Sequence, residues 1–132
     1  MDIAICVIHE ESRRMCYTGA CRPLVYIRNN SVEQIKACAY PIGGVMYERV
    51  GYKVHTVDLE EGDIFYIFSD GYPDQFGGEK NKKYMTPRFR KLLLSISNQS
   101  MKEQKILLDE EFNRWKGEEE QVDDVLVIGF KV

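Results

Sequence analysis

The chain has 132 residues, of which 44% are hydrophobic, a composition that is ordinary for a single globular domain. Charged residues make up 30% of the chain but nearly cancel, leaving a net charge of −3, which gives no reason to expect binding to nucleic acid or to an anionic membrane. No apolar run approaches the ~18 residues that a membrane-spanning helix needs. The amino-terminal residues MDIAICVI lack the basic region of a signal peptide. We therefore expect a cytoplasmic protein with no segment inserted in a membrane.

The first half of the chain is predicted to be rich in β-strands. Apolar residues on either side of a polar turn predict a hairpin over residues 3–20. Asn29-Asn30 separates two further strand-like segments, and this dipeptide is typical of a tight turn. Residues 53–59 alternate between apolar and polar, as in a half-buried strand. Residues 64–69 are apolar on both faces, which favours the centre of a covered sheet.

The second half is predicted to be helical until a final strand. Thr86-Pro87 is a helix start, because proline fits the first helical turn. Ser100 and Glu103 form a capping-box pattern, and the helix that follows them should end near Gly117. Residues 124–132 are predicted to form the closing strand. Strands followed by helices and one last strand indicate an α+β domain.

Three lysines lie close together in the loop that precedes the first helix, namely Lys80, Lys82 and Lys83. We interpret this short basic run as a solvated turn, and an anion-binding patch is the alternative.

Two groups of carboxylates stand at strand ends. Asp70 follows the apolar strand 64–69, whereas Asp123 and Asp124 directly precede the closing strand. If the two strands are antiparallel neighbours, these carboxylates meet at one sheet edge, where a hard divalent cation would relieve their repulsion. In this hypothesis Gly71 lets the turn after the strand bend, and Asp74 is close enough to touch a neighbouring metal ion. The alternative is that SDGYPD is simply a turn.

Five segments follow one another along the chain in this order: YTGACRPLVYIRN, PIGGV, LEEGDIFYIFSDG, SDGYPDQFGG and EQVDDVLVIGF. This ordered series resembles the metal-dependent serine/threonine protein phosphatase superfamily (protein phosphatase 2C-like), and the resemblance extends over essentially the whole chain. Within the superfamily, the stage II sporulation protein E branch, which includes regulators of anti-sigma-factor antagonists, is the most similar. One segment departs from the pattern, since Ala20-Cys21-Arg22 replaces the usual Gly-His-based sequence.

The resemblance implies a β-sandwich flanked by helices, with a two-metal site for Mn²⁺ or Mg²⁺. It implies that Asp70 and Asp123 are metal ligands, that Asp124 is a ligand or lies beside one, and that Asp74 contacts an additional metal, as in some members. The metal-bound water would be the nucleophile, so no further catalytic residue is expected. The implied substrate is a phosphoserine or phosphothreonine on a bacterial signalling protein, such as an anti-sigma-factor antagonist.

The chain also lacks a feature that the family carries in the first half of its domain, an Asp-Gly motif that supplies the aspartate bridging the two metals. We therefore expect residues 1–132 to be the C-terminal part of a single phosphatase domain, with an incomplete fold and little activity alone. The alternative is a non-catalytic signalling module that keeps the fold and binds a partner protein. An incomplete sheet would expose an edge and an apolar face, so we also expect a homodimer.

Overall fold

The computed structural model describes residues 1–43 and 51–132. The chain forms two compact units, which we call the β unit (residues 1–67 and 131–132) and the helical unit (residues 68–130). The last two residues of the PIGGV motif, Gly44 and Val45, lie outside the described residues, so this part of the resemblance has no structural test.

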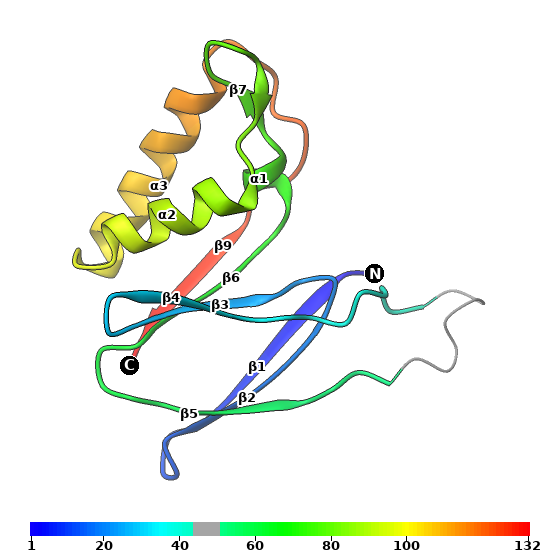
Figure 1. The fold of residues 1–132 in the computed structure, drawn as a ribbon, viewed down its shortest axis with the longest axis vertical. Helices are drawn as coiled ribbons and strands as arrows, with labels where there is room; N and C mark the ends of the chain where they lie inside the picture. The colour runs from blue at the N-terminus through cyan, green and yellow to red at the C-terminus, as the bar shows by residue number, and fades with distance from the viewer. Residues whose placement is uncertain (44–50) are drawn as a thin grey trace. The chain divides into compact units, whose positions relative to one another are not determined.

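The β unit contains the two predicted hairpins. One antiparallel sheet has the strand order β1-β2-β5, and its strands run alongside one another in Figure 1. The second sheet has the order β4-β3-β6-β9. The strands of the β unit are β1 (Ile3–His9), β2 (Arg14–Ala20), β3 (Leu24–Arg28), β4 (Ser31–Ile35), β5 (His55–Asp58) and β6 (Ile64–Phe68), whereas nearly all of β9 (Val127–Lys131) falls in the helical unit.

Local sequence explains the turns and the burial of these strands. Asn29 and Asn30 have φ values of 49° and 58°, the left-handed backbone that a two-residue hairpin turn requires. In β2, Met15 and Tyr17 are fully buried, whereas the residue between them is not, as expected for a strand with one face toward the core. β6 is buried on both faces apart from its partly exposed Ile67, which confirms its predicted place inside a sheet.

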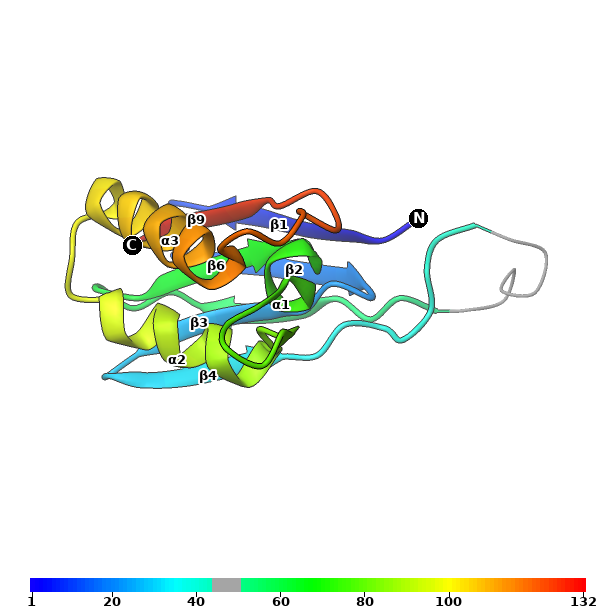
Figure 2. The same ribbon diagram turned by 90° about the horizontal axis from the view of Figure 1, so that it is seen from above.

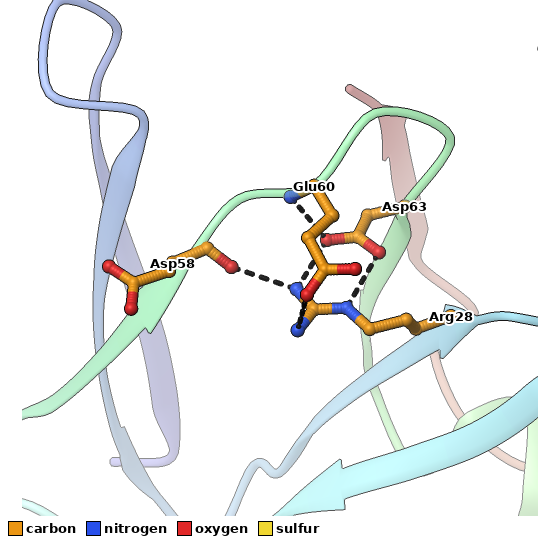
Figure 3. A network of polar contacts seen from close by, with 4 residues as sticks. All are labelled: Arg28, Asp58, Glu60 and Asp63. Atoms are coloured by element: carbon orange, nitrogen blue, oxygen red, sulfur yellow. Dashed lines mark hydrogen bonds and ion pairs between the residues drawn. The ribbon is translucent and has the colours of Figure 1, made fainter.

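Arg28 holds the turn between β5 and β6 through four contacts (Figure 3). Its Nε and Nη2 donate to the carboxylate of Asp63 at 2.9 and 2.6 Å, and Nη2 also donates to the carbonyl of Asp58 at 2.8 Å. Its Nη1 lies 2.8 Å from the Glu60 carboxylate. Asp63 is only 1% exposed, so its charge depends on this guanidinium. The hydrogen bond to Asp63 raises the pKa of Arg28 further above its usual range.

The helical unit begins after β6. Its elements are α1 (Gly71–Asp74), β7 (Phe76–Gly77), β8 (Lys82–Lys83), α2 (Thr86–Ile96) and α3 (Met101–Lys116), and most of β9 belongs to it. The sequence prediction is confirmed at three helix ends: Pro87 lies in the first turn of α2, Ser100 and Glu103 form the capping box of α3, and Gly117 with φ 53° ends α3. The closing strand is shorter than predicted, because the residues before Val127 do not pair as a strand.

An aromatic cluster fills the centre of the helical unit. Tyr72 of α1 lies 4.6 Å from Phe89 of α2 and 5.1 Å from Phe112 of α3, measured between ring centroids. Tyr84 contacts Tyr72 at 5.4 Å and Phe68 contacts Phe89 at 4.8 Å. These contacts fix the short helix α1 against the two longer helices, which lie side by side in Figure 2.

Among the described residues, no helix combines the length and the apolar character that crossing a bilayer would require.

Candidate functional site

Ser69 joins the segment that follows β6 to the segment that precedes β9. Its backbone N–H donates to the carbonyl of Leu126 at 2.9 Å. Its hydroxyl donates to the carbonyl of Asp124 at 2.8 Å and accepts the N–H of Leu126 at 2.9 Å. Three hydrogen bonds therefore join Ser69, the residue before Asp70, to the segment that contains Asp124 and Leu126. This is the neighbourhood on which the carboxylate hypothesis depended.

Gly71 packs directly against the same acidic segment. A Cβ atom at this position would overlap the carbonyl oxygen of Asp124 and would lie 2.9 Å from its carbonyl carbon and 3.2 Å from the Asp123 oxygen. Gly71 begins the helical turn α1, and its φ is not in the left-handed region, so its role in bending the chain stays a prediction. Glycine is needed here because two backbone segments approach each other too closely for a side chain.

The carboxylate of Asp123 is held by its own neighbours. Its Oδ1 accepts the backbone N–H of Asp124 at 2.7 Å, and its carbonyl accepts the side-chain amide of Gln121 at 2.8 Å. Asp123 and Asp124 are both exposed, whereas Asp70 is half-buried. An exposed carboxylate with one oxygen in a local hydrogen bond keeps the other oxygen available to a ligand.

Asp74 has a different environment. It is the last residue of α1, and its carboxylate forms an ion pair with Lys83 of β8 at 3.2 Å. Both side chains are almost half exposed, so the pair is weak. Contact of Asp74 with a metal ion would compete with this pair and stays a prediction.

Two buried side chains of the SDGYPDQ motif support this part of the helical unit, and the motif alone does not reveal them: Gln75 holds the acidic segment, and Tyr72 is bonded to α3. Gln75 is fully buried; its side-chain amide donates to the carbonyl of Glu120 at 2.9 Å, and its side-chain oxygen accepts the N–H of Val122 at 3.4 Å. Tyr72 donates its hydroxyl to the carbonyl of Leu108 at 2.8 Å, and burial raises its pKa well above the usual range. Both lie inside the motif SDGYPDQ, but nothing in the motif shows that these side chains point inward.

The candidate ligands of this site are carboxylates, the type of side chain that Mg²⁺ or Mn²⁺ prefers, but those among the described residues are too few to complete the coordination of such an ion. Hard cations prefer carboxylate oxygens, which Asp70 and Asp123 can supply from fixed positions beside strand ends. Within residues 1–43 and 51–132, however, no group of three or more acidic, histidine or cysteine side chains is arranged to hold a metal ion. The described residues therefore fit part of a cation site, and further ligands would have to come from elsewhere.

The stage II sporulation protein E (SpoIIE) family model matches residues 1–132, the whole chain. Among solved structures, the SiaA-PP2C domain of Pseudomonas aeruginosa is 26% identical, with a TM-score of 0.92 over 99% of this chain and 51% of that one. The phosphatase domain of the cell fate determinant SpoIIE from Bacillus subtilis, in a crystal presoaked with Mn, is 19% identical, with a TM-score of 0.73 over 100% of this chain and 56% of that one. RsbX in complex with magnesium is 18% identical, with a TM-score of 0.64 over 97% and 54% of the two chains.

No curated protein matches the chain significantly. The chain spans about half the length of the solved structures that it matches, as the 51% and 56% coverages show. Their similarity confirms the predicted α+β fold of the phosphatase 2C type. Because the family model matches from the first residue to the last, the chain belongs to the stage II sporulation protein E family of phosphatase 2C-type domains.

Proposed function

We propose that the chain supplies part of the catalytic centre of a metal-dependent protein serine/threonine phosphatase. The observation that supports the proposal is the joining of the SDG segment to the DDV segment by Ser69, which hydrogen-bonds Asp124 and Leu126. In this proposal Asp70 and Asp123 each donate one carboxylate oxygen to a Mn²⁺ or Mg²⁺ ion. The bound cations would lower the pKa of a water molecule and neutralise the phosphoryl oxygens.

The proposal assigns supporting roles to the other acidic residues of the site. Asp124 contributes its carbonyl to the bond with Ser69, and its carboxylate lies beside the metal ligands or serves as one. Asp74 would contact an additional metal only when its ion pair with Lys83 opens.

We further propose that residues 1–132 form the C-terminal part of one phosphatase domain. The coverage of about half of each matched structure supports this, as does the small number of candidate ligands among the described residues. The remaining ligands would come from the other part of the domain, so we expect little turnover by this chain alone. The proposed substrate is a phosphorylated signalling protein of the cytoplasm, such as an anti-sigma-factor antagonist.

Calorimetric titration of the chain with Mn²⁺ tests the site. We expect weak binding heat that disappears in Asp70→Asn and in Asp123→Asn. Glu118→Gln is the matched control, because it removes one exposed carboxylate of the acidic run after α3 and should leave the heat unchanged. Equal heats in all four proteins would overturn the assignment of the metal ligands.

A phosphopeptide assay with Mn²⁺ tests the reaction, using this chain and any longer protein that contains it. We expect the longer protein to release phosphate and to lose this activity on addition of a chelator or on Asp70→Asn. A non-catalytic module with the same fold is the competing function, and the small set of ligands in the described residues favours it. That function would be indicated if the longer protein binds a partner but neither binds Mn²⁺ nor releases phosphate.

A further inference from the structure

The helical unit contains a cavity of about 380 Å³ that the metal-site proposal does not use. The β7–β8 hairpin forms one wall, and residues from α2 and α3 form the others. Its volume falls in the range of about 300–1,000 Å³ that is typical of ligand pockets. The charged and aromatic residues that line it are Glu79, Lys80, Lys82, Arg88, Arg114 and Trp115.

The lining is predominantly cationic. Arg114 is compensated by Glu111, which it contacts through two hydrogen bonds of 2.7 and 2.8 Å. No ion pair to Lys80, Lys82 or Arg88 is formed by any residue that the structure describes. Three uncompensated cations therefore share the cavity with one carboxylate, that of Glu79. An excess of positive charge in a hollow favours an anionic ligand, although the chain as a whole is acidic.

Arg88 lies over two aromatic rings. Its guanidinium carbon is 4.3 Å from the ring centroid of Trp115 and 5.4 Å from that of Tyr84. Trp115 is fixed in turn, because its indole N–H donates to the carbonyl of Gln75 at 3.0 Å. The ring contacts leave the guanidinium N–H groups available for a bidentate bond to a carboxylate.

A second hydrogen bond holds Trp115 in the cavity wall. The N–H of Gly78, another lining residue, donates to the carbonyl of Trp115 at 2.9 Å. Gln75 supports the cavity through its backbone carbonyl, which accepts the indole N–H, and it holds the acidic segment at 120–122 through its side chain.

We propose that this cavity is a docking site for an acidic segment of a partner protein. Side-chain carboxylates of the segment pair with Arg88, Lys80 and Lys82, and an apolar portion packs against the indole of Trp115. A peptide fits the mixture of ring surface and separated cations better than a small inorganic anion, which would leave the indole uncovered. The proposal takes up the anion-binding alternative for the lysine run at 80–83. The inference rests on the cavity alone and not on the proposed phosphatase function.

Tryptophan fluorescence provides a direct readout, because Trp115 is the only tryptophan in the chain. The 132-residue chain is titrated with a nine-residue peptide that contains four glutamates and one leucine, at low and at high salt. We expect a saturable change in emission and an affinity that weakens as salt rises, because the charges are exposed. A peptide with glutamine in place of every glutamate should not bind.

Variants assign the binding to the cavity. Arg88→Gln removes the cation over the indole ring and should weaken binding at least about tenfold, the effect of losing a charge-assisted bond. Lys82→Gln should weaken binding several-fold, and it should not disturb the core because Lys82 lies on an exposed strand. Lys91→Gln is the matched control, because it removes an exposed cation of α2 that does not line the cavity.

Three outcomes would overturn the proposal. The first is no saturable change with the acidic peptide, and the second is equal affinity for the peptide in the Lys82 and Lys91 variants. The third is binding of inorganic phosphate or of a short single-stranded RNA as tightly as the acidic peptide, which would make the cavity a general anion site. Asp70→Asn, which tests the proposed metal site, should leave peptide binding unchanged, so failure of the metal site and failure of the docking site are distinguishable.

Discussion

Replacement of Gly71 by alanine tests the close contact on which the candidate site depends. In an ordinary helical turn, Gly→Ala stabilises a protein by about 0.5–1 kcal/mol, because alanine loses less backbone entropy. Here the added Cβ would overlap the carbonyl oxygen of Asp124. Relieving such an overlap costs about 1–3 kcal/mol. We therefore expect Gly71→Ala to lower the free energy of unfolding by about 1–2 kcal/mol, whereas the same change in an ordinary helical turn would raise it.

Urea denaturation followed by tryptophan fluorescence measures this loss, since Trp115 lies in the same unit as Gly71. Gly51→Ala is the matched control, because a Cβ at Gly51 meets no atom of residues 1–43 or 51–132 within 4 Å and its backbone is not left-handed. The reasoning would be refuted if Gly71→Ala were as stable as the parent chain or more stable.

A double-mutant cycle sharpens the test. Ser69→Ala removes the two side-chain hydrogen bonds to Asp124 and Leu126, each with a net value of about 1 kcal/mol. Because Ser69 and Gly71 hold the same acidic segment, their effects should be non-additive by more than about 0.5 kcal/mol. Strict additivity would mean that the two residues do not act on a shared contact.

Three further predictions concern the β unit. Arg28→Ala should destabilise the chain by about 3 kcal/mol in urea denaturation, because it leaves the buried Asp63 uncompensated. Arg14→Ala, which breaks an exposed pair, should cost less than about 1 kcal/mol. Equal losses of stability in the two variants would contradict this reasoning. Burial raises the pKa of Tyr17 and Tyr66 from 10.0 to about 12. The stability that depends on their neutral phenols should therefore be full below pH 10 and lost as pH rises toward 12. Thermal melts at increasing pH measure this, and a melting temperature that does not fall between pH 10 and 12 would contradict it. The edge strand β1 exposes several apolar side chains, so we expect two copies of the chain to associate. Light scattering should then show a particle mass that grows with concentration, and a monomer at every concentration would count against dimerisation.

Much of the fold was predictable because its signals are local. The paired asparagines at 29–30, the capping box of α3 and the glycine after it depend only on the conformations that nearby residues allow. The closing strand was predicted three residues too early, at Asp124, because the apolar pattern does not show where pairing begins.

The carboxylates of the candidate site could be predicted from the sequence, but the residues that hold the surrounding segments in place could not. Apolar strands that end in acidic residues are visible in the sequence, so Asp70 and Asp123 could be singled out. The roles of Gly71, Tyr72 and Gln75 could not, because each depends on a segment more than thirty residues away in the chain.

The sequence by itself therefore determined the order of the strands and helices, the turns, the helix ends and the acidic residues of the candidate site, because short-range sterics and hydrophobic periodicity act within a few residues. Only the tertiary structure decided that glycine at 71 permits a close approach of two backbone segments, that Gln75 holds the acidic segment, and that an arginine over an indole ring and two lysines line a cavity. These features arise where distant segments pack together, and packing depends on shapes and contacts that no local pattern records.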